Sequence, residues 1–172
     1  NGHKIEPGAN LSGADLSNGY LPRAYLWDSN LSDAILSNAF MEEAFLQNSN
    51  LSNADLRNSN LYIAELYSTN LGSANFSNAN LQYAKLQKEG LVSTNFNGTN
   101  FSKADLSGAT LYGADLTNAI FSGTSFEEAN LNYADLSEVD LSGLNFKETN
   151  LANANLSGAN FEGATLTNAD LG

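Results

Sequence analysis

A large apolar residue stands at every fifth position of this chain, and this spacing fits neither regular secondary structure. From Leu11 to Leu171 each fifth residue is Leu, Phe or Met. Five steps along an α-helix advance about 500°, which scatters these side chains around the helix. Five is also an odd number, so a straight strand would point successive residues to opposite faces. We therefore expect a chain that turns one corner in every five residues.

The other positions of the five-residue unit support a closed coil. Two residues before each apolar centre stands a small residue, with Glu89 and Leu144 as the clear exceptions, and between the two stands Asn or Asp in most units. If four corners close a coil of about twenty residues, every centre points to one axis and the small residue also faces inward. Asn and Asp side chains can then bond nearby backbone amides at the corners. Such units are stable only when coils stack on one another.

The stacking predicts which residues become neighbours. Residues twenty apart should lie one above the other on adjacent coils. Seven centres are Phe, and three pairs of them are twenty apart, so we expect ring stacking in these pairs: Phe76 with Phe96, Phe101 with Phe121, and Phe126 with Phe146.

Three runs of the sequence resemble a known family. ANLSGADLS (9–17), NADLRNSNL (53–61) and GANFEGATLTNADL (158–171) are similar to pentapeptide repeat proteins, whose unit is A(D/N)LXX. The resemblance implies an all-β fold, a right-handed quadrilateral parallel β-helix (a solenoid) with about eight coils of four pentapeptides. We expect one repeat domain over residues 9–172, after an N-terminal lead-in over residues 1–8 in which Ile5 folds over the first coil. Neither end shows a capping helix, so we expect a processed chain or part of a longer protein.

The residue inventory argues against catalysis. The single His, His3, lies outside the repeats, and the chain has no Cys. No phosphate-binding loop and no His/Cys metal motif occurs. The adjacent carboxylates Glu42–Glu43 and Glu127–Glu128 fall at outward positions, where solvated surface charge is the expected role. We therefore expect no enzyme activity, no catalytic or metal-binding residues and no cofactor, and no apolar run is long enough to span a membrane.

The acidity suggests one possible function. The formal net charge is −12, which repels nucleic acid and attracts proteins that bind nucleic acid. Some pentapeptide repeat proteins inhibit DNA gyrase by resembling DNA, so a DNA-mimic inhibitor is the alternative function. The candidate acidic stripe is Asp15, Asp55, Asp115 and Asp135, which are separated by multiples of twenty. Against this alternative, the remaining acids spread over all four faces, and the chain lacks the loops and dimerising ends of those inhibitors.

A second group of outward residues is aromatic. Phe40 is twenty residues from Tyr20, Phe45 is twenty from Tyr25, and Trp27 is close by. One explanation is structural: such columns stabilise the first coils through cross-strand aromatic contacts. Their gathering at one end also favours a docking surface. We therefore expect a non-enzymatic structural or protein-binding module, whose candidate binding residues are Tyr20, Tyr25, Trp27, Phe40 and Phe45. Through them the chain would bind a protein partner or another copy of itself, without direct contact to nucleic acid.

The segment KLQKEGLVST (85–94) breaks the pattern. Glu89 falls at an inward position, where a buried carboxylate without a partner costs several kcal/mol. We expect a small bulge at Glu89 and Gly90, with the register of the repeats continuing at Leu91 without an insertion. A milder widening of the wall is expected at Leu144 and Val139.

Overall fold

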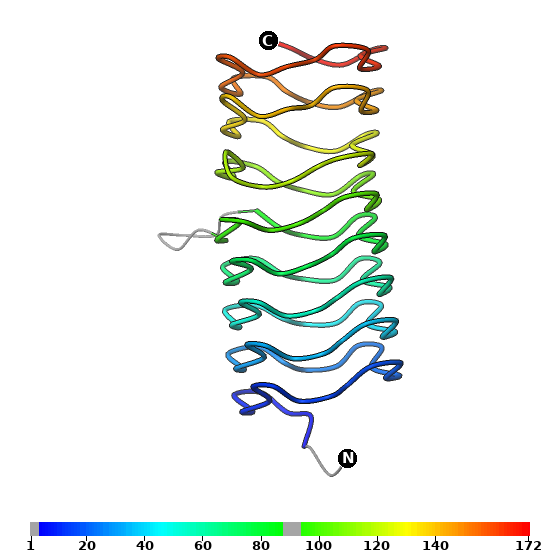
Figure 1. Ribbon diagram of the computed structural model, residues 1–172, viewed down its shortest axis with the longest axis vertical. Helices are drawn as coiled ribbons and strands as arrows, with labels where there is room; N and C mark the ends of the chain where they lie inside the picture. Colours follow the sequence, from blue (N-terminus) through cyan, green and yellow to red (C-terminus); the bar gives the residue numbers. More distant parts are fainter. Residues whose placement is uncertain (1–3, 88–93) are drawn as a thin grey trace.

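The chain forms a rod of stacked coils (Figure 1). The structure, a computed structural model, describes residues 4–87 and 94–172. Within these residues there is no helix, and the strands are reduced to single bridge residues, one in each pentad from Asn10 to Asp170. Most bridge residues pair in parallel with their counterparts on the next coil, as Asn10 does with Asn30 and Asp15 with Ile35. Four columns of bridges result, named here by their first members Asn10, Asp15, Tyr20 and Tyr25.

A tight turn joins each bridge to the next. The backbone N–H of Ala14 donates to the carbonyl of Leu11 at 3.0 Å, and equivalent bonds recur along the rod. The second residue after nearly every described centre has a positive φ, such as 65° at Gly13 and 56° at Asn18. Gly and Asn tolerate this left-handed conformation better than other residues do. These local preferences explain why the chain can turn in every pentad.

Ile63 occupies this turn position with a φ of 58°. A β-branched residue is strained there, and its side chain is 37% exposed. Replacing Ile63 by Asn should therefore raise the free energy of unfolding by about 1 kcal/mol, measured by urea unfolding. Ile63→Ala is the control, because it keeps most of the backbone strain and loses the packing. A stability of Ile63→Asn no higher than that of Ile63→Ala would contradict the expectation.

The Asn and Asp side chains of the bridge columns stabilise the corners as expected. Asn50 Oδ1 accepts the N–H of Ser52 at 3.1 Å, and the same bond occurs along all four columns. In the Asn10 column the side chains also bond one another. Asn70 Nδ2 donates to Asn50 Oδ1 at 3.0 Å, and Asn95 Nδ2 donates to Asn70 Oδ1 at 2.9 Å. This column therefore carries a side-chain ladder parallel to the backbone ladder.

The core lies on the axis of the rod. The centre residues from Leu31 to Leu86 and the Ala residues beside them are buried. Where the small residue carries a hydroxyl, the hydroxyl donates to a backbone carbonyl. Thr99 Oγ1 donates to Leu71 O of the preceding coil at 2.7 Å, and Ser59 Oγ donates to Leu56 O of its own coil at 2.6 Å. Ile5 packs against the first coils, as predicted.

The expectation that the register continues without an insertion is wrong. Asn70 pairs with Asn95 and Lys85 pairs with Thr110, so the spacing in each column increases here from twenty residues to twenty-five. The register of the columns therefore shifts by one pentad between Lys85 and Asn95. An unpaired carboxylate at an inward position would be costly, which gives a physical reason for the shift. The predicted bulge residues Glu89 and Gly90 themselves lie outside the described residues.

The shifted register changes the stacking of the Phe rings. Phe76 stacks on Phe101, with ring centroids 5.4 Å apart, and not on Phe96 as predicted. Phe96 instead lies tilted beside Phe101 at 6.1 Å. The other two predicted pairs are confirmed, at 5.7 Å for Phe101 and Phe121 and at 5.1 Å for Phe126 and Phe146.

Candidate functional site

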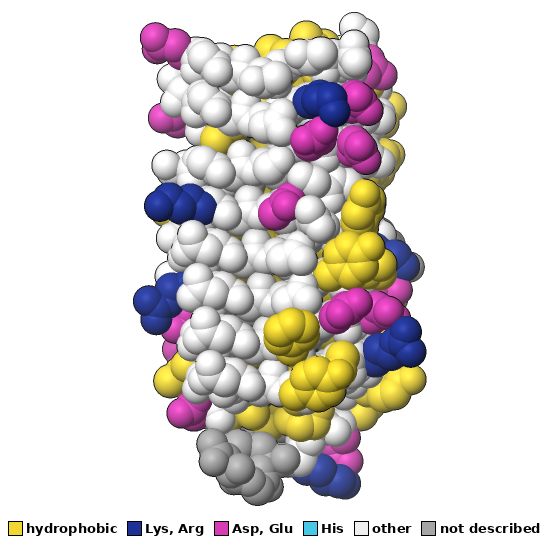
Figure 2. All heavy atoms as spheres, turned by 90° about the vertical axis from the view of Figure 1, so that its right-hand side faces the viewer, with side chains coloured by type: hydrophobic (Ala, Val, Ile, Leu, Met, Phe, Trp, Pro, Cys, Tyr) yellow, Lys and Arg dark blue, Asp and Glu magenta, His cyan; other side chains and the backbone are white. Residues whose placement is uncertain are grey.

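The outward aromatic residues near the N-terminus are here called the aromatic edge: Tyr20, Tyr25, Trp27, Phe40 and Phe45. The bridges Tyr20–Phe40 and Tyr25–Phe45 place them in two neighbouring columns. Tyr20 is 81% exposed and Phe40 is 50% exposed, whereas Phe45 is half-buried. Figure 2 shows hydrophobic side chains gathered toward one edge of the half of the rod that carries the N-terminus.

The rings of the aromatic edge form two groups of contacts, one in each column. Tyr25 and Phe45 stack with centroids 5.2 Å apart and planes 14° apart. Trp27 meets Tyr25 edge-on at 5.2 Å, and Tyr20 lies 6.3 Å from Phe40. These contacts hold the rings in place while leaving much of their surface open to solvent.

The structure adds two residues that the sequence analysis did not assign to this surface. Ile63 and Tyr83 occupy turn positions between the Tyr20 and Tyr25 columns, and Tyr83 meets Tyr62 edge-on at 5.9 Å. Tyr83 is 49% exposed. The available sequence clue was an apolar residue at a turn position that usually holds Asn, Asp, Ser or Gly.

A recess opens beside the aromatic edge, here called the Gln47 recess. It has a volume of about 360 Å³ and is lined by Tyr25, Trp27, Phe45, Gln47, Asn48, Glu65 and Tyr67. Gln47 is only 8% exposed, and its Nε2 donates to Glu65 Oε2. Lys85 Nζ lies 2.8 Å from the other carboxylate oxygen of Glu65. Gln47 Oε1 is buried and has no hydrogen-bond partner in the part of the chain that the structure describes.

An ion pair lies at the corner between the two aromatic columns. Arg23 donates to both carboxylate oxygens of Glu43, at 2.8 and 3.0 Å. Hydrogen bonding and charge attraction between the two raise the pKa of Arg23 and lower the pKa of Glu43. Both groups are exposed to solvent, so the pair adds little stability and chiefly fixes the position of the two side chains.

The predicted acidic stripe is divided by the structure. Asp15 and Asp55 belong to the Asp15 column, which continues through Asn75 to Asn100. Asp115 instead pairs with Asp135, which in turn pairs with Asn155. The Asp15 column continues from Asn100 to Ile120, one pentad after Asp115. Asp115 and Asp135 therefore lie on the neighbouring face. The one-pentad shift of register between Lys85 and Asn95 causes this difference, because it moves every later bridge residue by one face.

Several of these acids have a structural role at the corners. Asp135 Oδ1 accepts the Ser137 N–H, the Ser137 hydroxyl and Asn155 Nδ2. The bonds from Ser137 lower the pKa of Asp135, and bonds from Ser142 lower the pKa of Asp140. A carboxylate with a lowered pKa stabilises the fold while it is ionised, and the contribution is lost as the pH falls through the folded-state pKa.

This role predicts a pH dependence. Because Asn accepts the same bonds at any pH, Asp135→Asn/Asp140→Asn should lose less thermal stability than the parent between pH 6 and pH 3, with the difference arising below about pH 4. Melting curves followed by circular dichroism measure this loss. Glu128→Gln/Glu162→Gln removes the same charge at exposed positions and should behave like the parent. If both double variants lost equally less thermal stability than the parent, the change in net charge alone would explain the effect.

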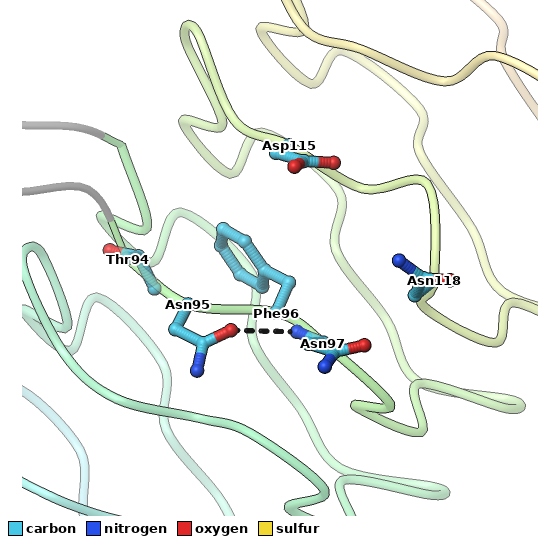
Figure 3. Close-up of a pocket in the computed structure, with 6 residues that line it drawn as sticks. All are labelled: Thr94, Asn95, Phe96, Asn97, Asp115 and Asn118. Atoms are coloured by element: carbon cyan, nitrogen blue, oxygen red, sulfur yellow. Dashed lines mark hydrogen bonds between the residues drawn. The ribbon is translucent and has the colours of Figure 1, made fainter.

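The ladder is interrupted at two places on the later coils. Among the described residues, no bridge joins Asn95 to Asp115 or Ile120 to Asp140. A cavity of about 300 Å³ lies at the first gap, where Phe96 separates Asn95 and Asn97 from Asp115 and Asn118 of the next coil (Figure 3). A second cavity of about 370 Å³ lies at the other gap and includes Val139 and Leu144 in its lining. The second gap fits the widening predicted there, because both bulky residues are buried at inward positions.

The described residues hold no group of three or more His, Asp or Glu side chains that could bind a metal ion. A search of the same residues finds no helix with the length and apolar character needed to cross a membrane.

The sequence matches a known family over nearly its whole length. The Pentapeptide repeats family matches in 8 copies, over residues 9–48, 41–77, 59–89, 74–111, 91–123, 109–147 and 145–172. The chain is a pentapeptide repeat protein. This confirms the family that the A(D/N)LXX units indicated. Curated proteins yield no match to this pentapeptide repeat protein.

Solved structures of pentapeptide repeat proteins agree with this fold. HetL from the cyanobacterium Nostoc, described as involved in heterocyst differentiation regulation, is 32% identical, with a TM-score of 0.51 over 95% of this chain and 83% of HetL. Trypsin-treated QnrB1, described as a plasmid-mediated fluoroquinolone resistance protein, is 21% identical, with a TM-score of 0.73 over 95% of this chain and 84% of that one. The likeness to QnrB1 supports the β-helical fold alone.

Proposed function

We propose that this pentapeptide repeat protein is a non-enzymatic structural or protein-binding module that docks a partner protein on the aromatic edge. The observation that supports the proposal most directly is the exposure of aromatic rings in two neighbouring columns. Tyr20, Tyr25 and Phe40 keep half or more of their surface in solvent, although polar residues fill most of the other bridge positions on the rod. Exposed apolar patches of this kind mark interaction sites in other soluble proteins.

The aromatic edge also has the composition of a binding hot spot. Trp, Tyr and Arg dominate the energetics of protein interfaces, and Arg23 lies beside Tyr20 at the corner of the rod, where it lines a cavity with Tyr20, Pro22, Glu42 and Glu43. The coils behind the edge fix the backbone through continuous ladder bonds, such as Phe40 N to Gly19 O at 2.8 Å. A partner would therefore meet a preorganised surface.

A purely structural role is the competing explanation. Cross-strand aromatic pairs contribute about 0.2–1 kcal/mol each, so the same rings could serve only to steady the first coils. The two roles differ in what their removal changes. Loss of a structural ladder lowers stability alone, whereas loss of a docking surface removes association at unchanged fold.

The test is quantitative affinity capture with three immobilised chains. The first is the parent, and the second is Trp27→Ser/Phe40→Ser/Phe45→Ser. The third is the control Tyr112→Ser/Tyr133→Ser, which removes an exposed aromatic pair at 5.5 Å on later coils. We expect the same purified partner to bind the parent and the control and to bind the triple variant at least tenfold more weakly. Equal binding to all three folded chains would contradict the proposal.

Self-association is the second form of the proposal and has its own measurement. Sedimentation velocity of the parent over a range of concentrations detects any dimer, and the triple variant shows whether the aromatic edge forms it. A concentration-dependent increase of the sedimentation coefficient in the parent, absent from the triple variant, would make the partner a second copy of this chain.

The DNA-mimic alternative loses its main support. Its stripe is divided between two faces, and Asp15, Asp55, Asp135 and Asp140 accept corner hydrogen bonds that stabilise the fold. We therefore do not propose inhibition of DNA gyrase for this chain.

A further inference from the structure

We infer that the Gln47 recess is the binding site for an arginine side chain of the partner protein. The inference rests on the proposed protein-binding function, since the arginine would be presented by the protein that docks on the aromatic edge. The recess adjoins that edge and shares Tyr25, Trp27 and Phe45 with it.

Two aromatic residues flank Gln47 in the stack of coils. Trp27, Gln47 and Tyr67 occupy the same turn position on three successive coils, as the bonds Asp28 N to Gln47 O and Asn48 N to Tyr67 O show. All three side chains line the recess. A planar group in the recess would therefore lie beside Gln47 and against aromatic rings.

Gln47 supplies the polar part of the site. Its Nε2 is committed to Glu65, and Oε1 is a buried acceptor without a partner among the described residues. Buried acceptors of this kind are rare, and most are satisfied by a donor. The missing group is therefore an N–H or O–H donor.

Arginine combines the features that the recess requires. Its guanidinium is planar, stacks on aromatic faces and carries five N–H donors. Lysine has a compact ammonium that cannot stack in this way. The net charge of −12 attracts a basic partner, while Lys85 already neutralises Glu65. The rings and Gln47 would therefore provide the recognition, and Glu65 would hold Gln47 in place.

The arginine is expected to come from another protein and not from a second copy of this chain. The chain has two arginines, and both are engaged by its own carboxylates. Arg23 bonds both oxygens of Glu43, and Arg57 bonds both oxygens of Asp55 at 2.8 and 2.7 Å.

Trp27 is the only tryptophan and lines the Gln47 recess, so its fluorescence reports directly on binding there. The experiment titrates the full chain with N-acetyl-arginine methylamide at constant ionic strength and follows tryptophan emission. The neutral citrulline analogue has the same planar shape, and the lysine analogue has the same charge. We expect a saturable change with arginine and at least about tenfold weaker binding of both analogues, since a cation–π contact of about 1.4 kcal/mol corresponds to a factor of ten.

Two variants identify the site. Gln47→Leu removes the acceptor and should weaken arginine binding about tenfold, and Tyr67→Leu should do so by removing one wall. Gln82→Leu makes the same change at the equivalent turn position of another edge, where Gln82 donates to Asp105 at 2.7 Å, and should bind like the parent. Circular dichroism confirms that each variant is folded.

Three results would overturn the inference: no saturable change with arginine, equal binding of citrulline, or undiminished binding by Gln47→Leu. Dissociation of a parent dimer by arginine would also overturn it, because the occupant would then be a second copy. These failures are distinct from failure of the proposed function. If the aromatic-edge variant loses its partner while arginine does not bind, the protein-binding function stands without this site.

Discussion

Replacing Phe101 by Ala should lower the free energy of unfolding by about 3–5 kcal/mol. Phe101 is fully buried and is the middle ring of a stack that continues to Phe76 on one side and Phe121 on the other. Phe96 lies against it as well. Alanine would remove all three ring contacts and leave a cavity on the axis of the rod.

The coils cannot close around that cavity. Phe101 N bonds Ile120 O at 2.8 Å, and Phe76 N bonds Asn100 O at 2.7 Å, so the ladder fixes the spacing of the coils on both sides. A site that cannot collapse is expected at the upper end of the range for large-to-small substitutions. Urea unfolding followed by circular dichroism measures the loss.

Phe161→Ala is the matched control for this prediction. Phe161 is half-buried and contacts one other ring, that of Phe146 at 5.4 Å. Replacing Phe161 by Ala should lower the free energy of unfolding by less than half as much as Phe101→Ala does. An equal loss in the two variants would show that the continuous Phe stack adds nothing beyond ordinary burial.

The interior of the coil was predictable because its pattern is local. A centre such as Leu56 and its small neighbour Ala54 belong to the same pentad, and both are buried as expected. The bond from Arg57 N to Asp55 Oδ1 also follows from residues two apart. Each of these features depends only on the sequence within one turn, where residue size and turn preference decide the conformation.

The pairing between coils was predictable only as far as the shift of register between Lys85 and Asn95. Tyr20 and Phe40 were placed correctly because no irregularity separates them. The pair Phe76 and Phe96 and the stripe from Asp55 to Asp115 both cross the segment between Lys85 and Asn95. The five-residue pattern continues through that segment of the sequence. Counting residues therefore could not show that the register of the columns shifts there by one pentad.

The Gln47 recess was not predictable from the sequence. Gln47, Gln82 and Gln87 all stand at the same position of the pentad, and nothing in the repeat distinguishes them. Gln47 differs from the other two in its neighbours on adjacent coils, which are Trp27 on one side and Tyr67 on the other. The candidate binding role of the aromatic edge remains a prediction, whereas its alignment in two columns follows directly from the twenty-residue period.

The second large effect is expected from the opposite change, an added side chain at a small position. Ala54→Leu should lower the free energy of unfolding by about 3 kcal/mol, at the upper end of the range for overpacked cores. Ala54 is fully buried between the centres Leu51 and Leu56, which are buried as well. Its carbonyl accepts Asn75 N at 2.9 Å and its N–H donates to Leu51 O at 3.0 Å, so the backbone cannot move outward without breaking ladder bonds.

Ala54→Ser is the control, because Ser49 and Ser59 occupy the equivalent position in neighbouring pentads and donate to the carbonyls of Leu46 and Leu56. Serine should therefore cost less than about 1 kcal/mol, since its hydroxyl finds the same type of partner. Unfolding in urea at one pH compares the two variants with the parent. If Ala54→Leu unfolded at the urea concentration of the parent, the inward wall would have room for a large side chain. The restriction to small residues would then have a cause other than packing on the axis.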